Sequence, residues 1–246
     1  MGKHQTLHSY LGFLFLFLSF FACSNTIAQT PVQIRDDVDQ HIFTFAEIHM
    51  LEDTSGTLTS EQIMTPGIDG QFRASIASTP QTLKLNTNYW FKLRIQNNPA
   101  AKKHFLLEFF DQTIDEITVY VPDTLGKYAA IDLGDQYPFA RRRLKHKNFE
   151  VPIDNEGGGI STYYIKIKSS QIADAIVVLR SVDWFIGYAL NEYLMFGIFY
   201  GMILVFSLYN LIMFISMKQR QYLFYVLYIL IVGFYEMSTD GIAYQY

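Results

Sequence analysis

The sequence contains very little cysteine and only a small excess of charge. Cys23 is the single cysteine among 246 residues, so neither a disulfide within the chain nor a cysteine-based metal site is possible. The formal net charge is −4, and no long basic run offsets it. A general nucleic-acid-binding protein needs a basic surface, so we predict no nucleic-acid partner.

Patterns that carry catalytic chemistry are also missing. The sequence has no glycine-rich phosphate loop and no cluster of side chains with metal-ligand spacing. Asp115 and Glu116 are adjacent in a predicted strand, so their side chains point to opposite faces and form a poor acid/base pair. We therefore predict that the chain is not an enzyme and holds no metal or cofactor.

Residues 1–28 have the pattern of a secretory signal peptide. Lys3 precedes an apolar stretch of about 12–14 residues, which is too short to span a bilayer comfortably. Thr26 and Ala28 place small residues at positions −3 and −1 of a cut before Gln29. The alternative is a lipoprotein signal with lipidation at Cys23. Both alternatives export the following segment, which in a bacterium means the periplasm.

Two apolar segments near the end of the chain predict membrane helices. Residues 193–217 carry no charge over 25 residues, which as a helix is roughly 37 Å long and enough to cross a bilayer. Lys218 and Arg220 follow, and positive residues favour the cytoplasmic side. The predicted order is a juxtamembrane connector at 184–192, a first helix at 193–217, a cytoplasmic turn at 218–221, a second helix at 222–241 and a truncated end at 242–246.

Small and polar residues in the first apolar segment suggest how it packs. Gly197 and Gly201 form a small-xxx-small pair, which is typical of close helix–helix contacts, although glycine is also common in membrane helices. Asn210 lies inside the predicted hydrocarbon region, where an amide needs a partner, and we expect that partner on another helix.

Residues 29–183 read as a series of short strands with a period of two. In the strand around Trp90, the side chains of Tyr89, Phe91, Leu93 and Ile95 share one face, and those of Trp90, Lys92, Arg94 and Gln96 share the other. Similar runs recur at roughly ten-residue spacing, with turn signals and no helical stretch between them. This pattern predicts an all-β jelly roll or β-sandwich.

Two groups of residues are candidate ligand-binding sites. Trp90, Lys92 and Arg94 place an aromatic ring beside charged donors, which suits stacking on a sugar, unless Trp90 packs beneath a loop or a second sheet. The second candidate is the basic segment RRRLKHKN, which could bind an anionic ligand or the lipid headgroups of the membrane, or could be a solvated loop. Its candidate residues are Arg141, Arg142, Arg143 and His146.

The segments NYWFKLRIQNN, LLEFFDQTIDEITVYVPD and STYYIKIKSS, followed by the two apolar segments, resemble one known family in their order and spacing. That family is the bacterial seven-transmembrane receptors with diverse intracellular signalling modules (7TMR-DISM), and the soluble part is similar to its type-2 extracellular domain. The resemblance implies a jelly-roll sensor of carbohydrate or a related small ligand. It also implies a seven-helix bundle followed by an output module such as a histidine kinase or a diguanylate cyclase.

The chain departs from this plan because it holds two of the seven helices and no output module. We therefore expect a truncated seven-helix bundle and interpret the chain as the sensing portion of a receptor in the bacterial inner membrane. The alternative is a non-enzymatic, membrane-anchored adaptor that docks another membrane or periplasmic protein.

Overall fold

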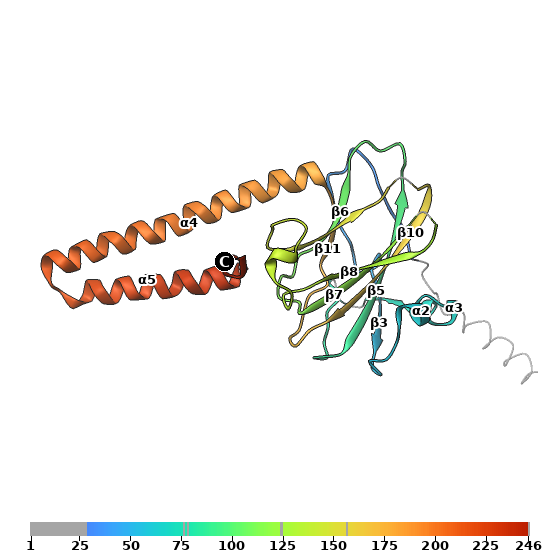
Figure 1. The fold of residues 1–246 in the computed structure, drawn as a ribbon, viewed down its shortest axis with the longest axis horizontal. Coiled ribbons are helices and arrows are strands. Elements are labelled where there is room, and N and C mark those ends of the chain that lie inside the picture. Colours follow the sequence, from blue (N-terminus) through green and yellow to red (C-terminus); the bar gives the residue numbers. More distant parts are fainter. Residues whose placement is uncertain (1–28, 76, 78, 124, 156, 246) are drawn as a thin grey trace, which may run out of the picture.

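The soluble part of the protein is built from two β-sheets that pack face to face. The computed structural model describes residues 29–245 except 76, 78, 124 and 156 (Figure 1). The predicted signal peptide, with Cys23, lies outside the described residues. One sheet has seven strands in the order β4-β3-β5-β10-β7-β8, with the short β1 pairing parallel to β5. The other has four strands in the order β2-β11-β6-β9, and every other pairing in both sheets is antiparallel.

The strands of both sheets are short, as the period-two runs in the sequence predict. The seven-stranded sheet comprises β1 (Val32–Gln33), β3 (His49–Asp53), β4 (Arg73–Ala74), β5 (Asn88–Asn97), β7 (Glu116–Pro122), β8 (Tyr128–Leu133) and β10 (Gly159–Lys168). The four-stranded sheet comprises β2 (Gln40–Ile42), β6 (Phe105–Phe109), β9 (Phe149–Ile153) and β11 (Val177–Ser181). The predicted β-sandwich is therefore confirmed.

The main core lies between the two sheets and follows the alternation of the strands. On β5 the side chains of Tyr89, Phe91, Leu93 and Ile95 are buried in this core, as the period of two predicts. Leu107 of β6 and other inward residues of the four-stranded sheet meet them from the opposite side. Burial of these apolar side chains is the main stabilising contribution to the sandwich.

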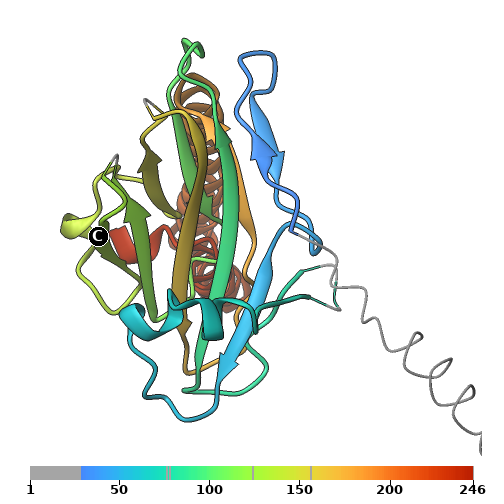
Figure 2. The ribbon, with the colours of Figure 1, turned by 90° about the vertical axis from the view of Figure 1, so that its right-hand side faces the viewer.

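The outer face of the seven-stranded sheet is partly covered by two short helices, α2 (Ser60–Ile63) and α3 (Pro66–Asp69), in the connection between β3 and β4 (Figure 2). Thr59 caps α2, because its side chain accepts from the backbone N–H of Gln62 while the Gln62 side chain accepts from the Thr59 N–H. The cover creates a second, smaller apolar cluster that contains Ile63, Phe72, Trp90 and Tyr164.

Two long helices follow the sandwich and form an antiparallel hairpin (Figure 1). Helix α4 (Val182–Met217) has 36 residues, about 54 Å, and α5 (Arg220–Thr239) has 20 residues, about 30 Å. Both are long and apolar enough to cross a membrane. The residues predicted as a connector, 184–192, are part of α4, which begins directly after β11 with Ser181 as its N-cap.

The far end of α5 returns to the sandwich rather than ending away from it. The Tyr200 hydroxyl on α4 donates to an Asp240 carboxylate oxygen at 2.7 Å, at the level where α5 ends. The Gln112 side-chain amide, in the sandwich, donates to the backbone oxygen of Thr239 at 2.6 Å. The short helix η2 (Ala243–Gln245) then lies against the sandwich, where the Tyr244 hydroxyl donates to the backbone oxygen of Tyr137.

Within the hairpin, the close contact between α4 and α5 is made at Gly233. A Cβ added there would lie 3.1 Å from a side-chain carbon of Ile203, whereas a Cβ at Gly197 or Gly201 would meet nothing within 4 Å. The Asn210 amide donates to the backbone oxygen of Phe206 in its own helix at 2.8 Å. None of the three predicted packing residues therefore joins α4 to α5, and their contact with a different helix stays a prediction.

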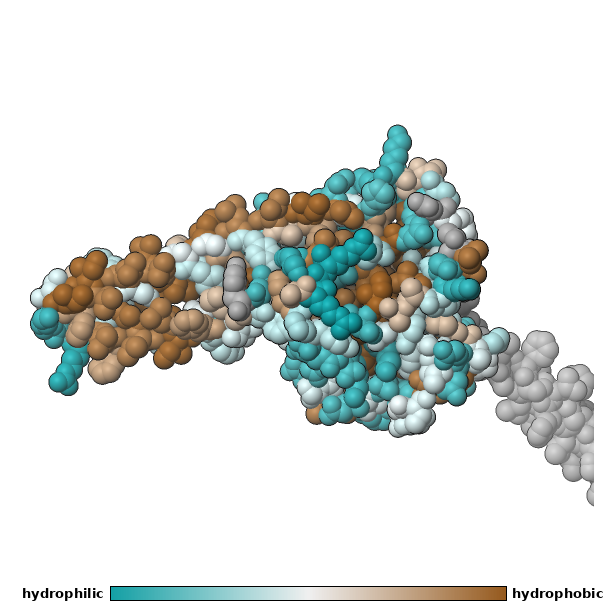
Figure 3. Space-filling view, in the orientation of Figure 1, coloured by the Kyte–Doolittle hydropathy of each residue, from teal (hydrophilic) through white to brown (hydrophobic). Residues whose placement is uncertain are grey.

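The remaining faces of both helices are apolar and exposed (Figure 3). Large side chains such as Val205, Ile212, Ile231 and Phe234 are more than half exposed. Such a surface suits lipid or further membrane helices rather than water.

Candidate functional site

A cavity on the outer face of the seven-stranded sheet is lined by charged side chains, among them Lys92 and Arg94. Strands β5 and β10 pair antiparallel, with Lys92 opposite Tyr164 and Arg94 opposite Thr162. Because the four residues share one face of the sheet, their side chains form the floor of the cavity.

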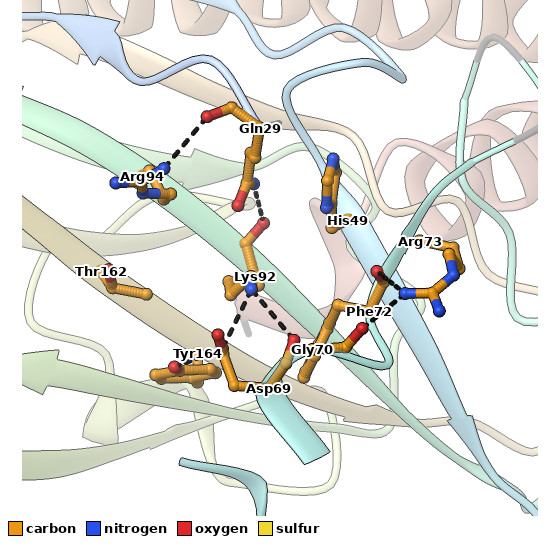
Figure 4. Close-up of a pocket in the computed structure, with 10 residues that line it drawn as sticks. All are labelled: Gln29, His49, Asp69, Gly70, Phe72, Arg73, Lys92, Arg94, Thr162 and Tyr164. Carbon is orange, nitrogen blue, oxygen red and sulfur yellow. Dashed lines mark hydrogen bonds and ion pairs between the residues drawn. The ribbon is translucent and has the colours of Figure 1, made fainter. Parts of the chain in front are cut away.

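The wall of the cavity comes from α3, from the segment that follows it, from β3 and from Gln29 ahead of β1. The cavity encloses about 460 Å³, which is within the usual range for small-molecule sites. Figure 4 shows its ten lining residues, which are Gln29, His49, Asp69, Gly70, Phe72, Arg73, Lys92, Arg94, Thr162 and Tyr164.

The single carboxylate among these residues, that of Asp69, is bound by two neighbours. Lys92 Nζ lies 2.9 Å from Asp69 Oδ1, and the Tyr164 hydroxyl donates to the same oxygen at 2.7 Å. Burial raises the pKa of Tyr164, and its hydrogen bond to Asp69 raises it further, so the hydroxyl stays protonated and acts as a donor. Lys92 Nζ also lies 5.1 Å from the centre of the Phe72 ring, a cation–π distance.

Two buried polar side chains in the wall have unused hydrogen-bonding atoms. His49 is 8% exposed and Gln29 is 6% exposed. Among the described residues, neither His49 Nε2 nor Gln29 Oε1 has a hydrogen-bond partner. Burial lowers the pKa of His49, and the positive charges of Lys92, Arg73 and Arg94 lower it further, so its imidazole is neutral near pH 7.

The predicted role of Trp90 as an exposed stacking plate is not what the structure shows. Its side chain is 1% exposed and stacks on Tyr120 at a ring-centroid distance of 5.7 Å, beneath the cover formed by α2 and α3. Trp90, Lys92 and Arg94 do share a face, but Trp90 does not line the cavity. The alternative interpretation, packing beneath a loop, describes its position correctly. The aromatic residues that line the cavity are Phe72 and Tyr164, which are 4% and 6% exposed.

The basic segment 141–148 is divided between solvent and interior, and it lies apart from the cavity. Arg141 and Arg143 are exposed. Arg142 is buried, its guanidinium lies 4.3 Å from the centre of the Phe149 ring, and it donates to the backbone oxygen of His146 at 2.9 Å. Arg142 is therefore a structural residue, and only Arg141 and Arg143 of the predicted arginines face outward.

His146 connects the sandwich to the first membrane helix. It is 2% exposed, with Nδ1 3.1 Å from a Glu150 oxygen on β9 and Nε2 3.2 Å from a Glu192 oxygen on α4. Lys147 Nζ and the Tyr188 hydroxyl also reach Glu192, at 3.0 and 2.9 Å. Burial by itself would lower the pKa of His146, but the bonds to Glu150 and Glu192 raise it above its usual value.

A second buried pair continues this polar layer on the outer face of the four-stranded sheet. Arg180 of β11 pairs with Glu108 of β6, and Glu108 also accepts from the Asn148 amide at 2.6 Å. The Arg180 guanidinium then lies 4.4 Å from the centre of the Trp184 ring at the start of α4. The first turns of α4 are thus fastened to the sandwich by charged and aromatic contacts.

Sequence reasoning found two of the cavity residues, Lys92 and Arg94, but not the others. Asp69, His49 and Gln29 are 23, 43 and 63 residues away from Lys92 along the chain. The one available signal was the period of two in residues 159–168, which places Thr162 and Tyr164 on a common face.

Fold and site together define a class of protein. A β-sandwich with a polar cavity is joined without a linker to helices that are apolar enough for a membrane, which is the plan of a membrane-bound sensor. The family described as 7TMR-DISM extracellular 2 matches residues 46–181, and the family described as 7TM diverse intracellular signalling matches residues 192–246. The chain therefore belongs to the 7TMR-DISM receptors, and its soluble part is their extracellular sensing domain.

These two families are receptor and membrane domains, not enzyme families. No curated protein matches the chain. Among solved structures, it resembles TmCBM61 in complex with β-1,4-galactotriose at 10% identity, covering 55% of this chain and 84% of that chain with a TM-score of 0.28. It also resembles the enzymatically active domain of bacteriophage CBA120 tailspike protein 4 at 10% identity, covering 58% of this chain and 18% of that chain with a TM-score of 0.21.

Proposed function

We propose that this chain is the ligand-sensing portion of a receptor in the bacterial inner membrane, with its sandwich in the periplasm. A small, carbohydrate-like ligand binds in the cavity on the outer face of the seven-stranded sheet. Binding there biases the position of α4, and an output module such as a histidine kinase or a diguanylate cyclase reads that change.

The observation that carries the proposal is the cavity itself. Hydrogen-bond donors and acceptors line its floor and wall, among them Lys92, Arg94, Thr162 and Asp69. The rings of Phe72 and Tyr164 also line it. Saccharides are bound by this combination, in which polar groups meet the hydroxyls and an aromatic ring meets a C–H face.

The connection between sandwich and helix supports a transmitting role. Strand β11 ends at Ser181 and α4 begins at Val182, so no flexible linker separates the domain from the helix. The His146–Glu192 contact and the Arg180–Trp184 contact hold the first turns of α4 against the four-stranded sheet. A shift of this sheet therefore moves α4 with it.

Ligand binding is tested by titrating the full chain, in lipid nanodiscs, against a panel of neutral and acidic saccharides by calorimetry. We expect at least one saccharide to bind, and Arg94→Ala to weaken its binding. Arg35→Ala is the matched control, because Arg35 is an exposed arginine outside the cavity. If no saccharide binds, or if both variants weaken binding equally, the cavity is not the sensing site.

The membrane arrangement is tested by cysteine labelling in a Cys23→Ser background. Leu125 is 81% exposed in the β7–β8 loop, and Gln219 lies in the turn between α4 and α5. In intact spheroplasts we expect a membrane-impermeant maleimide to label Leu125→Cys, and to label Gln219→Cys only after permeabilisation. The opposite pattern would contradict a periplasmic sandwich.

A further inference from the structure

The positively charged side chains that line the cavity outnumber the carboxylates that line it. Arg73, Lys92 and Arg94 line it together with one carboxylate, that of Asp69, which is already paired with Lys92. Neither Arg73 nor Arg94 has a carboxylate within ion-pair distance among the described residues. The cavity therefore holds a net positive charge, which Asp69 neutralises only in part.

Among the described residues, the hydrogen bonds of the two arginines leave most of their donors unused. Arg94 donates through Nη1 to the backbone oxygen of Gln29 at 3.2 Å, and Arg73 donates through Nη1 to the backbone oxygens of Gly70 and Phe72. A guanidinium has five N–H donors in a planar fork that matches a carboxylate. Arg94, which is partly buried and next to Thr162, is the better placed of the two for a bidentate contact.

Two further observations indicate that the wall is built for a polar ligand. His49 and Gln29 are both more than nine-tenths buried, and each presents a polar atom that no described residue satisfies. Native proteins seldom leave such atoms unpaired, and a bound ligand is one way to satisfy them. In the view of Figure 4, Arg94 and Arg73 lie on opposite sides of the cavity, with Lys92 and Asp69 between them.

We propose that the cavity binds an acidic sugar, a saccharide that carries a carboxylate of the uronic-acid type. The ligand's carboxylate pairs with the Arg94 guanidinium, and its ring lies beside Phe72 and Tyr164. Asp69 accepts from a ligand hydroxyl, while Arg73 contributes positive charge from the other side. This inference rests on the proposed function, because it specifies the ligand class of the same cavity.

Methyl β-D-glucuronide and methyl β-D-glucoside are suitable probes because they differ only in the carboxylate at C6. Calorimetric titration of the full chain in nanodiscs should show glucuronide binding at least about tenfold tighter than glucoside, the effect of one charge-assisted hydrogen bond. Raising the salt concentration should weaken glucuronide binding and leave glucoside binding unchanged. This salt comparison uses the unaltered protein, so it does not depend on a variant that folds.

Variants then assign the contact to Arg94. We expect Arg94→Gln to weaken glucuronide binding about ten- to a hundredfold and Arg94→Lys to restore part of it. The control Arg35→Gln, at an exposed arginine outside the cavity, should have no effect. Circular dichroism shows whether each variant keeps the β-sandwich.

The outcomes separate this inference from the proposed function. If glucoside binds as tightly as glucuronide, the acidic-sugar inference is wrong but a saccharide sensor remains. If succinate or inorganic phosphate binds while neither saccharide does, the cavity is an anion site and the sugar assignment is wrong. If none of the four compounds binds, and no member of the wider saccharide panel does, both proposals are overturned.

Discussion

The contact between His146 and Glu192 offers the sharpest test of how the sandwich holds the first membrane helix. We predict that Glu192→Gln loosens α4 from the sandwich. The carboxylate accepts from His146, Lys147 and the Tyr188 hydroxyl at 3.2, 3.0 and 2.9 Å. Glutamine removes the charge and turns an N–H₂ group toward at least one of these donors.

The size of the effect follows from burial and from the number of bonds lost. The Glu192 side chain is 17% exposed, and its partners His146 and Lys147 are 3% and 11% exposed, so solvent screens the ion pairs only weakly. A hydrogen bond to a charged group contributes about 1.5–3 kcal/mol. We expect the free energy of unfolding of the sandwich to fall by about 2–3 kcal/mol, which for a domain of this size lowers Tm by roughly 4–12 °C.

Tryptophan fluorescence provides the assay, because the chain has two tryptophans. In a Trp184→Phe background, Trp90 alone reports melting from the interior of the sandwich. Glu116→Gln is the matched control, since Glu116 lies 3.8 Å from Lys168 with both side chains about 40% exposed. Such exposed pairs contribute about 0–1 kcal/mol.

Two comparisons decide the outcome. Tyr188→Phe, which removes one hydrogen bond to Glu192, should lower Tm by less than Glu192→Gln. If the Tm of Glu192→Gln falls no further than that of Glu116→Gln, then this network does not hold α4 against the sandwich. That result would refute the proposal that a shift of the sandwich is transmitted to α4 through these contacts.

Three other substitutions test separate parts of the structure. For Trp90→Ala we expect a loss of about 3–5 kcal/mol in the free energy of unfolding, measured by chemical denaturation, because a fully buried ring is removed; a loss under about 1 kcal/mol would contradict its burial. Glucuronide affinity should rise as the pH falls below about 6.5, because the bound carboxylate raises the lowered pKa of His49 and binding then takes up a proton. His49→Gln should remove this pH dependence when binding is measured by calorimetry. The variant keeps the other charged and titratable groups that face His49, which are Lys92, Arg73, Arg94, Asp69 and Tyr164. Gly233→Val should weaken cysteine cross-linking between α4 and α5 by clashing with Ile203, whereas Gly201→Val should not; equal effects would contradict the observed contact.

The sequence by itself determined the β-sandwich class, the inward face of β5 and the two apolar helices. These features follow from local periodicity, because side chains alternate along a strand and an uncharged run of 25 residues suits a bilayer. The alternation on β5 placed Phe91 and Leu93 in the core and Lys92 and Arg94 on the other face, as the structure confirms. The boundary between sandwich and helix was less well predicted, since α4 begins at Val182 and includes the expected connector.

Only the tertiary structure decided which residues on the outer face of the seven-stranded sheet are covered and which line a cavity. Period two shows that Trp90 and Arg94 share a face, but not that α2 and α3 cover Trp90 and leave Arg94 at a cavity. Likewise, the sequence shows His146 only as a member of a basic segment. The structure places it in contact with Glu192, which lies 46 residues further along the chain. The physical reason is that burial and pairing depend on segments remote in sequence, and local periodicity carries no information about which segments meet.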